Sequence, residues 1–285
     1  MKKSSKPAER KALAEYARET YGLSLRQACR FLWISRRMFH YRRRLKDDGE
    51  VIDALARLVE QYPRYGFYKL FAVLRRAGHP WNHKRVYRVY RQMKLNLRRK
   101  HKKRLRRVPP HPLLQPLNPN YCWSMDFMHD SLSCGKVFRT FNLVDDYNRE
   151  GLGIDIGTCL PAERITRFLD QLIGVRGKPK RIRSDNGSEA TSAHFQEWAK
   201  AQGIEMDYIQ PGKPMQNGFI ERFNGTYRRE VLDLYLFSSL DEVRRETQRW
   251  LQEYNTKRPH DAFGNLTPVE FLISKGHRHV SHFAW

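Results

Sequence analysis

Three acidic residues in the second half of the chain have the type and spacing to do chemistry together. Asp126 lies within the apolar segment 123–127, Asp185 begins a turn that contains Asn186 and Gly187, and Glu221 lies in the first turn of an expected helix. A carboxylate inside an apolar strand is costly unless it is paired or bound to a metal ion. Ligands of α/β sheets bind at the carboxyl ends of strands, which is where Asp185 is expected.

The surroundings of Glu221 in the sequence are unusual for a helical glutamate. A Glu at this place ordinarily pairs with a Lys or Arg three or four positions away. The residues at those offsets are all uncharged: Asn217, Gly218, Asn224 and Gly225. The nearest basic residue on the same helix face is Arg228, seven positions on. The carboxylate of Glu221 is therefore expected to be free.

Each of the three acids also has an ordinary structural explanation. Asp126 could accept hydrogen bonds from a neighbouring loop, Asp185 could form a plain turn, and Glu221 could stabilise the helix N-terminus. Together, however, two strand-associated Asp residues and one helical Glu are the oxygen ligands that Mg²⁺ prefers. A pair of such ions can activate an attacking oxygen and stabilise a leaving oxygen in phosphodiester chemistry.

An α/β domain that begins near residue 121 is expected to position these acids. Three strands come first and helices then alternate with short strands, which is typical of a mixed sheet covered by helices. The expected strands are 121–130, 135–146, 151–158, 181–184 and 204–209, and the expected helices are 161–175, 193–203, 219–233, 240–254 and one that starts at 268. In the first strand, Asp126 shares a face with Ser124 and Met128. Asp145 and Asp146, in an expected turn, are weaker candidates for chemistry.

The positive charge of the chain is confined to its N-terminal part. The net charge is +24, and residues 1–120 hold 32 Lys and Arg against 8 Asp and Glu, whereas the remaining residues hold 22 of each. Charge segregated in this way indicates a polyanion-binding region attached to a neutral globular domain. A solvated basic face is the ordinary alternative, but an excess of this size favours nucleic acid.

Residues 8–46 are expected to form three short helices that include a helix-turn-helix unit. Ser24 and Gln27 form a capping box, and Ser35 caps the following helix, which is expected to run from Arg36 to Leu45. This helix carries the basic residues that we expect to contact DNA phosphates: Arg36, Arg37, His40 and Arg42. A helical hairpin with a charged face is the alternative.

A second helical module is expected over residues 50–98. Helices are expected at 51–62 and 66–78, and Asn82 caps a third helix whose tyrosines are expected in the core. Basic residues lie off the apolar stripe of this helix and are expected to contact DNA: Lys84, Arg85 and Arg88.

A basic run and a proline-rich segment follow this module. The run 97–107 is expected to follow a phosphate backbone through Lys102, Lys103 and Arg104. Residues 109–120 contain five prolines and predict a stiff linker. The predicted domains are 1–48 for the helix-turn-helix, 49–98 for the second module, 99–120 for the linker and 121–285 for the catalytic core with its C-terminal helices.

The cysteines and the chain ends indicate a reduced, cytosolic protein. The four cysteines have no CxxC spacing, and the chain has neither a signal peptide nor an apolar run of roughly 18 residues. A Cys/His zinc site is disfavoured because no ligand pair has the required spacing. We therefore expect no membrane partner.

The spacing of the three acids resembles that of the DDE transposases and retroviral integrases. Between Asp126 and Asp185 lie 58 residues, and between Asp185 and Glu221 lie 35. Four segments are similar to OrfB-type transposases of insertion sequence family three: NPNYCWSMDF, IRSDNGSE, QPGKPMQNGFIERFNGTYRREVL and YNTKRPHDAFGNLTPVEF. The resemblance covers nearly the whole chain. It implies an α/β, RNase H-like catalytic domain with a mixed five-stranded sheet, preceded by all-α helix-turn-helix modules.

The resemblance also implies a reaction. Asp126, Asp185 and Glu221 would hold two Mg²⁺ ions, with Mn²⁺ as an alternative. Water would cut a phosphodiester at a transposon end, and the freed 3′-hydroxyl would attack another phosphodiester without a covalent protein–DNA intermediate. Further residues would contact DNA near the cut: Lys213, Gln216, Asn217, Arg222, Asn224 and Arg228.

The resemblance implies partners as well. They are terminal inverted repeats, target DNA and further copies of the chain on paired ends, in the bacterial cytoplasm at the nucleoid. Family members are often made as a fusion with an upstream reading-frame product, which is a candidate partner here. The zinc module of retroviral integrases is absent. On sequence alone, two other functions stay open: a DNA-binding regulator that uses only the helical modules, and a nuclease that cuts without joining.

Overall fold

The computed structural model describes residues 6–42, 47–97, 113–187, 189–210 and 214–279. It separates the chain into two units, 1–50 and 51–285. Four predicted DNA contacts lie outside the described residues: Lys102, Lys103, Arg104 and Lys213. No helix in the described parts of the chain combines the length and the apolarity that crossing a membrane requires.

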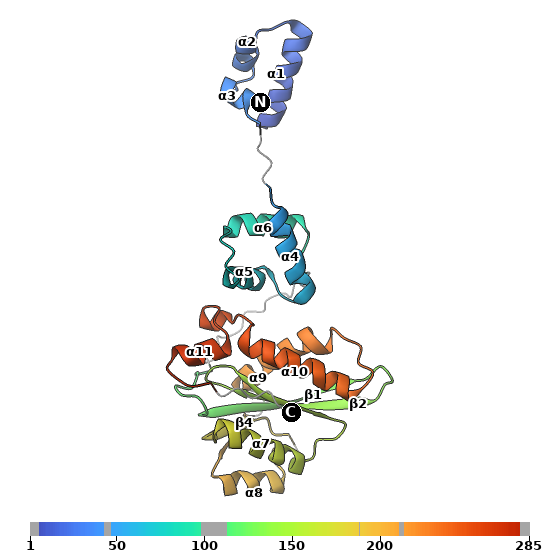
Figure 1. Cartoon of the computed structure of the whole chain (residues 1–285), viewed down its shortest axis with the longest axis vertical. Coiled ribbons are helices and arrows are strands. Elements are labelled where there is room, and N and C mark those ends of the chain that lie inside the picture. The colour runs from blue at the N-terminus through green and yellow to red at the C-terminus, as the bar shows by residue number, and fades with distance from the viewer. Residues whose placement is uncertain (1–5, 43–46, 98–112, 188, 211–213, 280–285) are drawn as a thin grey trace. The chain divides into compact units, whose positions relative to one another are not determined.

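The first unit is built from three helices, α1 (Pro7–Tyr21), α2 (Leu25–Phe31) and α3 (Arg36–His40) (Figure 1). The predicted caps form, because Ser24 accepts a hydrogen bond from the backbone of Gln27 and Ser35 accepts one from the backbone of Met38. The small core consists of buried residues from all three helices and the turn: Ala14, Ala28, Cys29, Ile34 and Phe39. This is a helix-turn-helix arrangement.

Helix α3 is shorter than predicted. It ends at His40 and not at Leu45, and Tyr41 is already extended with a ψ of 119°. Phe39 is the last residue of this segment that enters the core, whereas Tyr41 is 67% exposed. A short helix depends on tertiary packing for its stability, so it stops where that packing stops.

Three more helices form the second helical module: α4 (Gly49–Gln61), α5 (Phe67–Arg76) and α6 (His83–Gln92). Asn82 caps α6 as predicted, with its Oδ1 accepting from the backbone of Lys84 at 2.8 Å. Their apolar faces share one core that includes Leu55, Leu70 and Val86. Tyr90 is buried as expected, but Tyr87 is 40% exposed.

A five-stranded mixed sheet forms the centre of the remaining chain. Its strands are β1 (Cys122–Ser131), β2 (Val137–Asp145), β3 (Gly151–Gly157), β4 (Arg181–Ser184) and β5 (Glu205–Tyr208). The strand order is β3-β2-β1-β4-β5, with β1, β2 and β3 antiparallel and with β4 and β5 parallel to β1. The predicted mixed sheet of five strands is confirmed.

Helices cover both faces of this sheet (Figure 1). Helices α7 (Ala162–Arg176) and α8 (Ala193–Gln202) lie on one face, and α9 (Gly218–Tyr227), α10 (Leu240–Thr256) and α11 (Pro268–Ser274) lie on the other side. Met125 packs in the core under α7 and α8, whereas Met128 packs under α9 and α10. The predicted alternation of β1 is therefore correct, and Asp126 faces α9.

The predicted helix 219–233 is regular only in its first part. Helix α9 follows a 3₁₀ turn, Pro214–Asn217, and gives way after Tyr227 to a π-helical turn, Arg228–Leu232. Within this wider turn, Val231 and Leu232 stay in the core. Arg228, at its start, donates a hydrogen bond to the carbonyl of His129 on β1 at 2.8 Å. Such π-helical turns are frequent at functional sites.

Candidate active site

Three different elements bring the three predicted acids to one side of the sheet. Asp126 lies in the middle of β1 and faces α9, and Asp185 directly follows β4. Because β4 is parallel to β1 and pairs Arg183 with Ser124, the end of β4 lies level with the middle of β1. Glu221 lies in the first turn of α9, which packs on β1 and β2.

A chain of two asparagines holds Asp126. Asn142, its cross-strand partner on β2, donates to Asn224 Oδ1 at 2.7 Å, and Asn224 Nδ2 donates to Asp126 Oδ2 at 2.8 Å. The other oxygen, Oδ1, accepts from the backbone of Phe127 at 2.8 Å. This chain links β2, α9 and β1, so the position of α9 and the orientation of the Asp126 carboxylate are coupled.

The charges of Asp185 and Glu221 act on Asp126. Burial raises the pKa of Asp126 from 3.8 to about 6, and the negative charges of Asp185 and Glu221 contribute to the increase. Hydrogen bonds from Phe127 and Asn224 oppose it. Asp126 is thus poised between its charged and neutral forms near pH 6.

Neither of the other two acids has a cationic partner in the described parts of the chain. Asp185 Oδ1 accepts from the backbone of Gly187 at 3.1 Å, which is the predicted turn. Glu221 is exposed and forms neither a hydrogen bond nor an ion pair with any described residue. The prediction that Glu221 is free of local partners is confirmed within those residues.

The carboxylates are neighbours but are not gathered around one point. Among the described residues, no three His, Cys, Asp or Glu side chains converge closely enough to hold a metal ion.

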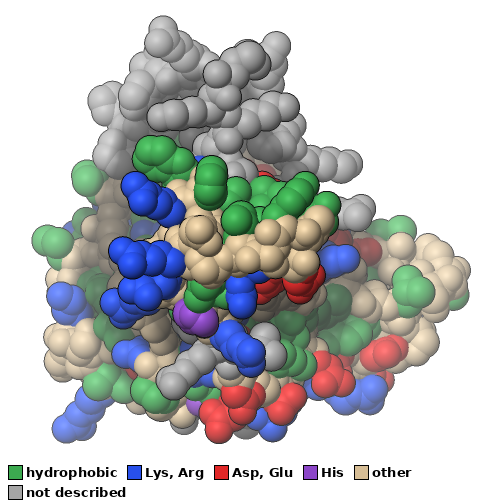
Figure 2. All heavy atoms as spheres, turned by 90° about the horizontal axis from the view of Figure 1, so that it is seen from above, with side chains coloured by type: hydrophobic (Ala, Val, Ile, Leu, Met, Phe, Trp, Pro, Cys, Tyr) green, Lys and Arg blue, Asp and Glu red, His purple; other side chains and the backbone are tan. Residues whose placement is uncertain are grey.

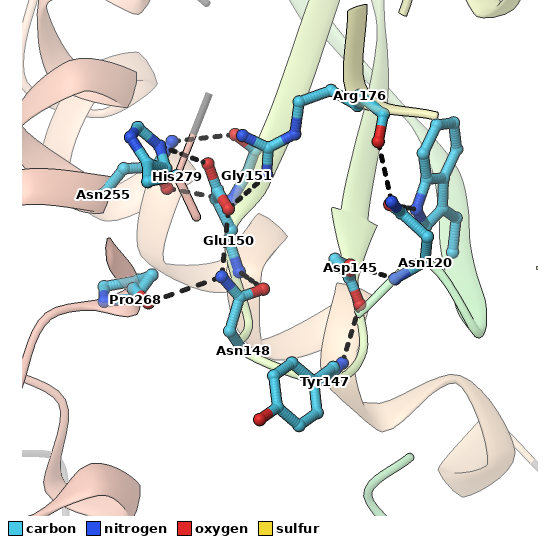
Figure 3. Close-up of polar contacts among 11 residues, drawn as sticks. Asn120, Asp145, Tyr147, Asn148, Glu150, Gly151, Arg176, Asn255, Pro268 and His279 are labelled. Carbon is cyan, nitrogen blue, oxygen red and sulfur yellow. Dashed lines mark hydrogen bonds and ion pairs between the residues drawn. The ribbon is translucent and has the colours of Figure 1, made fainter. Parts of the chain in front are cut away.

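The competing acids at the β2–β3 turn have different surroundings. Asp145 accepts from the backbone amides of Asn120 and Tyr147 at 2.8 and 2.9 Å (Figure 3). Asp146 accepts from Ser124 Oγ at 2.6 Å and forms an ion pair with Arg183 at 2.8 Å. Burial raises the pKa of Asp145 to about 7 and also raises the pKa of Asp146. Every carboxylate oxygen of this pair has a partner.

Glu150, in the same turn, was not singled out by the sequence and is almost fully buried. It forms an ion pair with Arg176, bonds to His279 at 3.1 Å, and accepts from Asn148 at 2.9 Å (Figure 3). Burial alone would raise its pKa, but these three partners together lower it. Glu150 therefore ties the turn to α7 and to the segment after α11.

The predicted DNA contacts on and before α9 divide into buried and accessible residues. Asn217 and Asn224 are 4% and 6% exposed, so a DNA strand cannot reach them in this conformation. Asn224 instead positions Asp126. Gln216 accepts from the backbone of Gln210 at 2.8 Å, and Arg228 forms an ion pair with Asp130 at 3.3 Å.

The helical modules carry the other predicted contacts. Four of these side chains are exposed: Arg36, Arg37, His40 and Arg42. On α6, Lys84 is exposed, whereas Arg85 and Arg88 are partly buried and interact within the protein. Figure 2 shows Lys and Arg side chains gathered beside apolar ones on the face that it views.

Sequence reasoning missed Asn142. This residue is fully buried in the apolar strand β2 and is the cross-strand neighbour of Asp126. The sequence feature that could have revealed it is an asparagine between the apolar residues Phe141 and Leu143, since a buried polar side chain in an apolar strand needs a partner. The partner, Asn224, lies 82 residues away in the chain, which sequence spacing does not reveal.

Comparison with known families and proteins identifies the fold of the chain. The chain matches the Integrase core domain family over residues 116–214 and again, through a second description of that domain, over 202–268. It matches an HTH-like domain family over residues 46–103. The two integrase matches together span all five strands and α7 to α10. With the observed sheet, they identify an RNase H-like fold.

Several proteins of mobile elements are similar to the chain. An uncharacterised protein of insertion element IS407 from Burkholderia multivorans is 38% identical over 89% of this chain and 92% of its own length. A protein of insertion element IS476 from Xanthomonas euvesicatoria is 35% identical over 88% of this chain and 73% of its own. The catalytic core of HTLV-2 integrase, solved with magnesium, aligns over 54% of this chain and 97% of its own, with 24% identity and a TM-score of 0.43.

Proposed function

Since the chain belongs to the OrfB-type transposases of insertion sequence family three, we propose that it binds terminal inverted repeats and uses Asp126, Asp185 and Glu221 to cut and join DNA strands. DNA transposition and recombination are the function of the family, and a polynucleotidyl transferase is its enzyme class. What we propose for this chain in particular is the role of the three acids, the identity of the metal and the DNA ends that it binds.

One observation carries the proposal. Three carboxylates from three separate elements lie close enough for Asp185 and Glu221 to raise the pKa of Asp126, yet none is paired with a described cation. Such a concentration of negative charge lowers the stability of a fold unless a cation is bound. Acids kept together in this way are typical of a functional site.

The donor set fits a hard divalent cation. Carboxylate oxygens are the preferred ligands of Mg²⁺, and we propose that Asp126, Asp185 and Glu221 hold two Mg²⁺ ions, which Mn²⁺ can replace. When bound, these ions supply stabilisation of charge on the attacking and leaving oxygens. We propose that the three acids come closer together when cations and DNA bind.

The protein's own side chains prepare this step. Asn224 holds one oxygen of Asp126 and leaves the carboxylate facing α9. Glu221, exposed and without a described partner, is free to turn toward Asp126 and Asp185. Arg228 fixes the far end of α9 to β1 through His129 and Asp130. Movement of Glu221 is therefore confined to the first turn of the helix and its own side chain.

The reaction proposed has two steps. Water first attacks a phosphodiester at a transposon end and leaves a 3′-hydroxyl, which then attacks a phosphodiester of target DNA. The leaving group of the second step is a 3′-oxygen of the target, so one phosphodiester breaks as another forms. In both steps negative charge develops beside Asp126, Asp185 and Glu221, where bound cations would stabilise it.

The helical modules would hold the DNA. Exposed Arg36, Arg37, His40, Arg42 and Lys84 are placed to contact phosphates, which fix position and orientation on the duplex. Two ends must be brought together for transposition, so we propose that several copies of the chain assemble on paired ends. An upstream reading-frame product, fused or separate, is a candidate for supplying further DNA contacts.

The test uses the full chain and duplex DNA that carries the terminal repeats of its own element. With Mg²⁺, wild-type protein should nick the duplex at the repeat end, and a pre-cut end with a free 3′-hydroxyl should be joined to target DNA. Asp185→Asn should bind the duplex with unchanged affinity and neither nick nor join it.

Three results would contradict the proposal in different ways. Full activity of Asp185→Asn would remove the triad assignment. Nicking without joining of the pre-cut end would indicate a nuclease. Binding of DNA with no strand breakage by the wild type, and no effect of replacing all three acids, would indicate a DNA-binding regulator.

A further inference from the structure

A second charged feature lies beside α9. It includes Arg222, a predicted DNA contact, and the reaction proposed above gives its other residues no role. A cavity of about 300 Å³ is lined by side chains of α5, α9, the β2–β3 turn and the segment around 258–262. Its basic lining residues are Lys69, Arg149, Arg222, Arg229, Arg258 and His260. The lining includes one carboxylate, that of Asp261.

Helix α9 and the turn that follows it present the acid and the cations on different faces. Arg222, Thr226 and Arg229 line the cavity and are spaced by four and three residues, which places them along one side of the helix. Glu221 precedes Arg222 by one position, which is a rotation of about 100° around a helix of 3.6 residues per turn. The cavity is thus separate from the face that meets Asp126.

Arg149 is held in the cavity by an unusual backbone conformation. It is a non-glycine residue with a φ of 58°, in the left-handed region that most side chains avoid. Its guanidinium lies 3.9 Å from the centre of the Phe219 ring, and its Nε is buried without a hydrogen-bond partner in the described structure. The β2–β3 turn therefore places Arg149 in the cavity, where it forms no ion pair with a described carboxylate.

The cations of the cavity have few partners. Arg258 forms an ion pair with Glu230 at 2.9 Å. In contrast, Arg149, Arg222 and Arg229 have no carboxylate within ion-pair distance among the described residues. Arg229 reaches only the hydroxyl of Thr226, at 3.4 Å. Three guanidinium groups therefore share one concave site, and none of them forms an ion pair with a described carboxylate.

The pKa shifts agree with an excess of positive charge. Burial and the charge of Arg258 lower the pKa of Lys69 to about 8. Burial and the charge of Arg222 lower the pKa of Arg149. Burial, Arg258 and Lys69 lower the pKa of His260 to about 3, so this ring is neutral at pH 7. Burial is the largest cause of each shift, and a bound anion would reduce the smaller contribution of repulsion between the cations.

We propose that this cavity binds a phosphate group, and that the group is a backbone phosphate of DNA that does not itself react. Arginine guanidiniums bind phosphate through paired hydrogen bonds, and two or three around one cavity are a typical oxyanion site. The assignment to DNA rests on the proposed function, whereas the binding of phosphate does not. A phosphate held by Arg149 and Arg222 would position the strand next to the helix turn that carries Glu221.

Inorganic phosphate tests the site without DNA or catalysis. Calorimetric titration should show phosphate binding to the wild type, weakened about tenfold or more by Arg222→Gln and by Arg149→Gln. Arg222 is exposed, so its replacement does not threaten the fold. Arg245→Gln is the matched control, because Arg245 is an exposed arginine of α10 outside the cavity. Equal phosphate binding by all four proteins would overturn the proposal.

A duplex of unrelated sequence tests the source of the phosphate. The slope of log Kd against log salt concentration should fall by about one for Arg222→Gln relative to the wild type and Arg245→Gln. Weakened phosphate binding with an unchanged slope would overturn the assignment to DNA.

Glu221→Gln separates this proposal from the catalytic one. That variant should lose strand cleavage and keep phosphate binding. Loss of phosphate binding in Glu221→Gln would mean that the cavity is not separate from the acids, and would contradict the site as proposed. A wild-type protein that binds phosphate but does not cleave DNA would contradict only the proposed function.

Discussion

Two groups of three carboxylates can be compared, one at the candidate site and one around the β2–β3 turn. Only in the second group does every carboxylate oxygen have a hydrogen-bond or ion-pair partner in the described parts of the protein. Asp145 and Asp146 use all their oxygens in hydrogen bonds or ion pairs, and Glu150 is bonded on both oxygens. Asp126, Asp185 and Glu221 have amide partners at most, and Glu221 has none among the described residues.

This difference separates structural acids from candidate catalytic ones. A buried carboxylate with complete partners specifies a fold, since removing one partner leaves a buried charge. A group of carboxylates without cations lowers stability, and its retention requires a benefit elsewhere. Burial alone would point to the wrong region as the candidate site, because Asp145 and Asp146 are more deeply buried than Asp126.

The largest expected effect is on catalysis. Glu221→Gln should reduce strand cleavage about a thousandfold, or roughly 4 kcal/mol of transition-state stabilisation, because the amide is a poor ligand for the cation. Its thermal midpoint should not fall, since Glu221 is exposed and forms no hydrogen bond or ion pair with a described residue. Glu197→Gln, an exposed change on α8, is the control and should cleave as the wild type does.

In the β2–β3 turn the large effect should be on stability. Glu150→Ala should lower the free energy of unfolding by about 3 kcal/mol, because it removes the buried carboxylate that Arg176, His279 and Asn148 share. Urea unfolding measures this change. The double variant with Arg176→Met should recover part of the loss. Additive losses from the two single changes would show that the pair is not coupled, and would weaken the contrast between the regions.

Asp126 and Glu150 should respond to pH with opposite signs, because the pKa of Asp126 is raised and that of Glu150 is lowered. The pKa of Asp126 is raised to about 6, so the native state keeps a proton that the unfolded chain releases between about pH 4 and 6. Without divalent metal, Asp126 therefore costs stability as pH rises through this window. The pKa of Glu150 is lowered from 4.5, so its contribution is lost as pH falls below that value.

Unfolding experiments in a chelator from pH 3.5 to 7 measure both slopes. Asp126→Asn should gain stability over the wild type as pH rises from about 4 to 6, by on the order of 1 kcal/mol per pH unit at most. Glu150→Gln should differ less from the wild type as pH falls below about 4.5. The same sign for both differences would contradict the different surroundings of Asp126 and Glu150.

A smaller effect is expected from the residue that positions Asp126. Asn224→Ala should reduce cleavage about tenfold, equivalent to about 1.4 kcal/mol, by freeing one oxygen of Asp126. The reduction should appear in kcat more than in KM, because Asn224 is buried and cannot touch DNA in this conformation. A change confined to KM would instead favour a direct DNA contact.

The sequence predicted the parts of this site that depend on local pattern. Strand alternation placed Asp126 on the face of Met128, and the capping residues Ser24, Ser35 and Asn82 marked helix starts that the structure has. Offsets along one helix showed that Glu221 lacks a local partner. These features depend on neighbours in the chain, so periodicity and propensity are enough to find them.

Features set by tertiary contact were not predictable. The Asn142–Asn224–Asp126 chain joins segments far apart in sequence, and the left-handed backbone of Arg149 lies in the connection between β2 and β3. The early end of α3 and the π-helical turn after Tyr227 follow from where packing stops or widens. Such outcomes are decided by the core and not by the propensity of the segment.

The most direct test compares six isosteric variants in one series. Asp126→Asn, Asp185→Asn and Glu221→Gln are measured beside Asp145→Asn, Asp146→Asn and Glu150→Gln, for the free energy of unfolding and for Mg²⁺-dependent strand cleavage per folded molecule. We predict that the first three fold at least as stably as the wild type and do not cleave, and that the second three lose stability but still cleave when folded. Normal cleavage by any of the first three, with loss of cleavage by a fully folded Asp145 or Asp146 variant, would contradict the account.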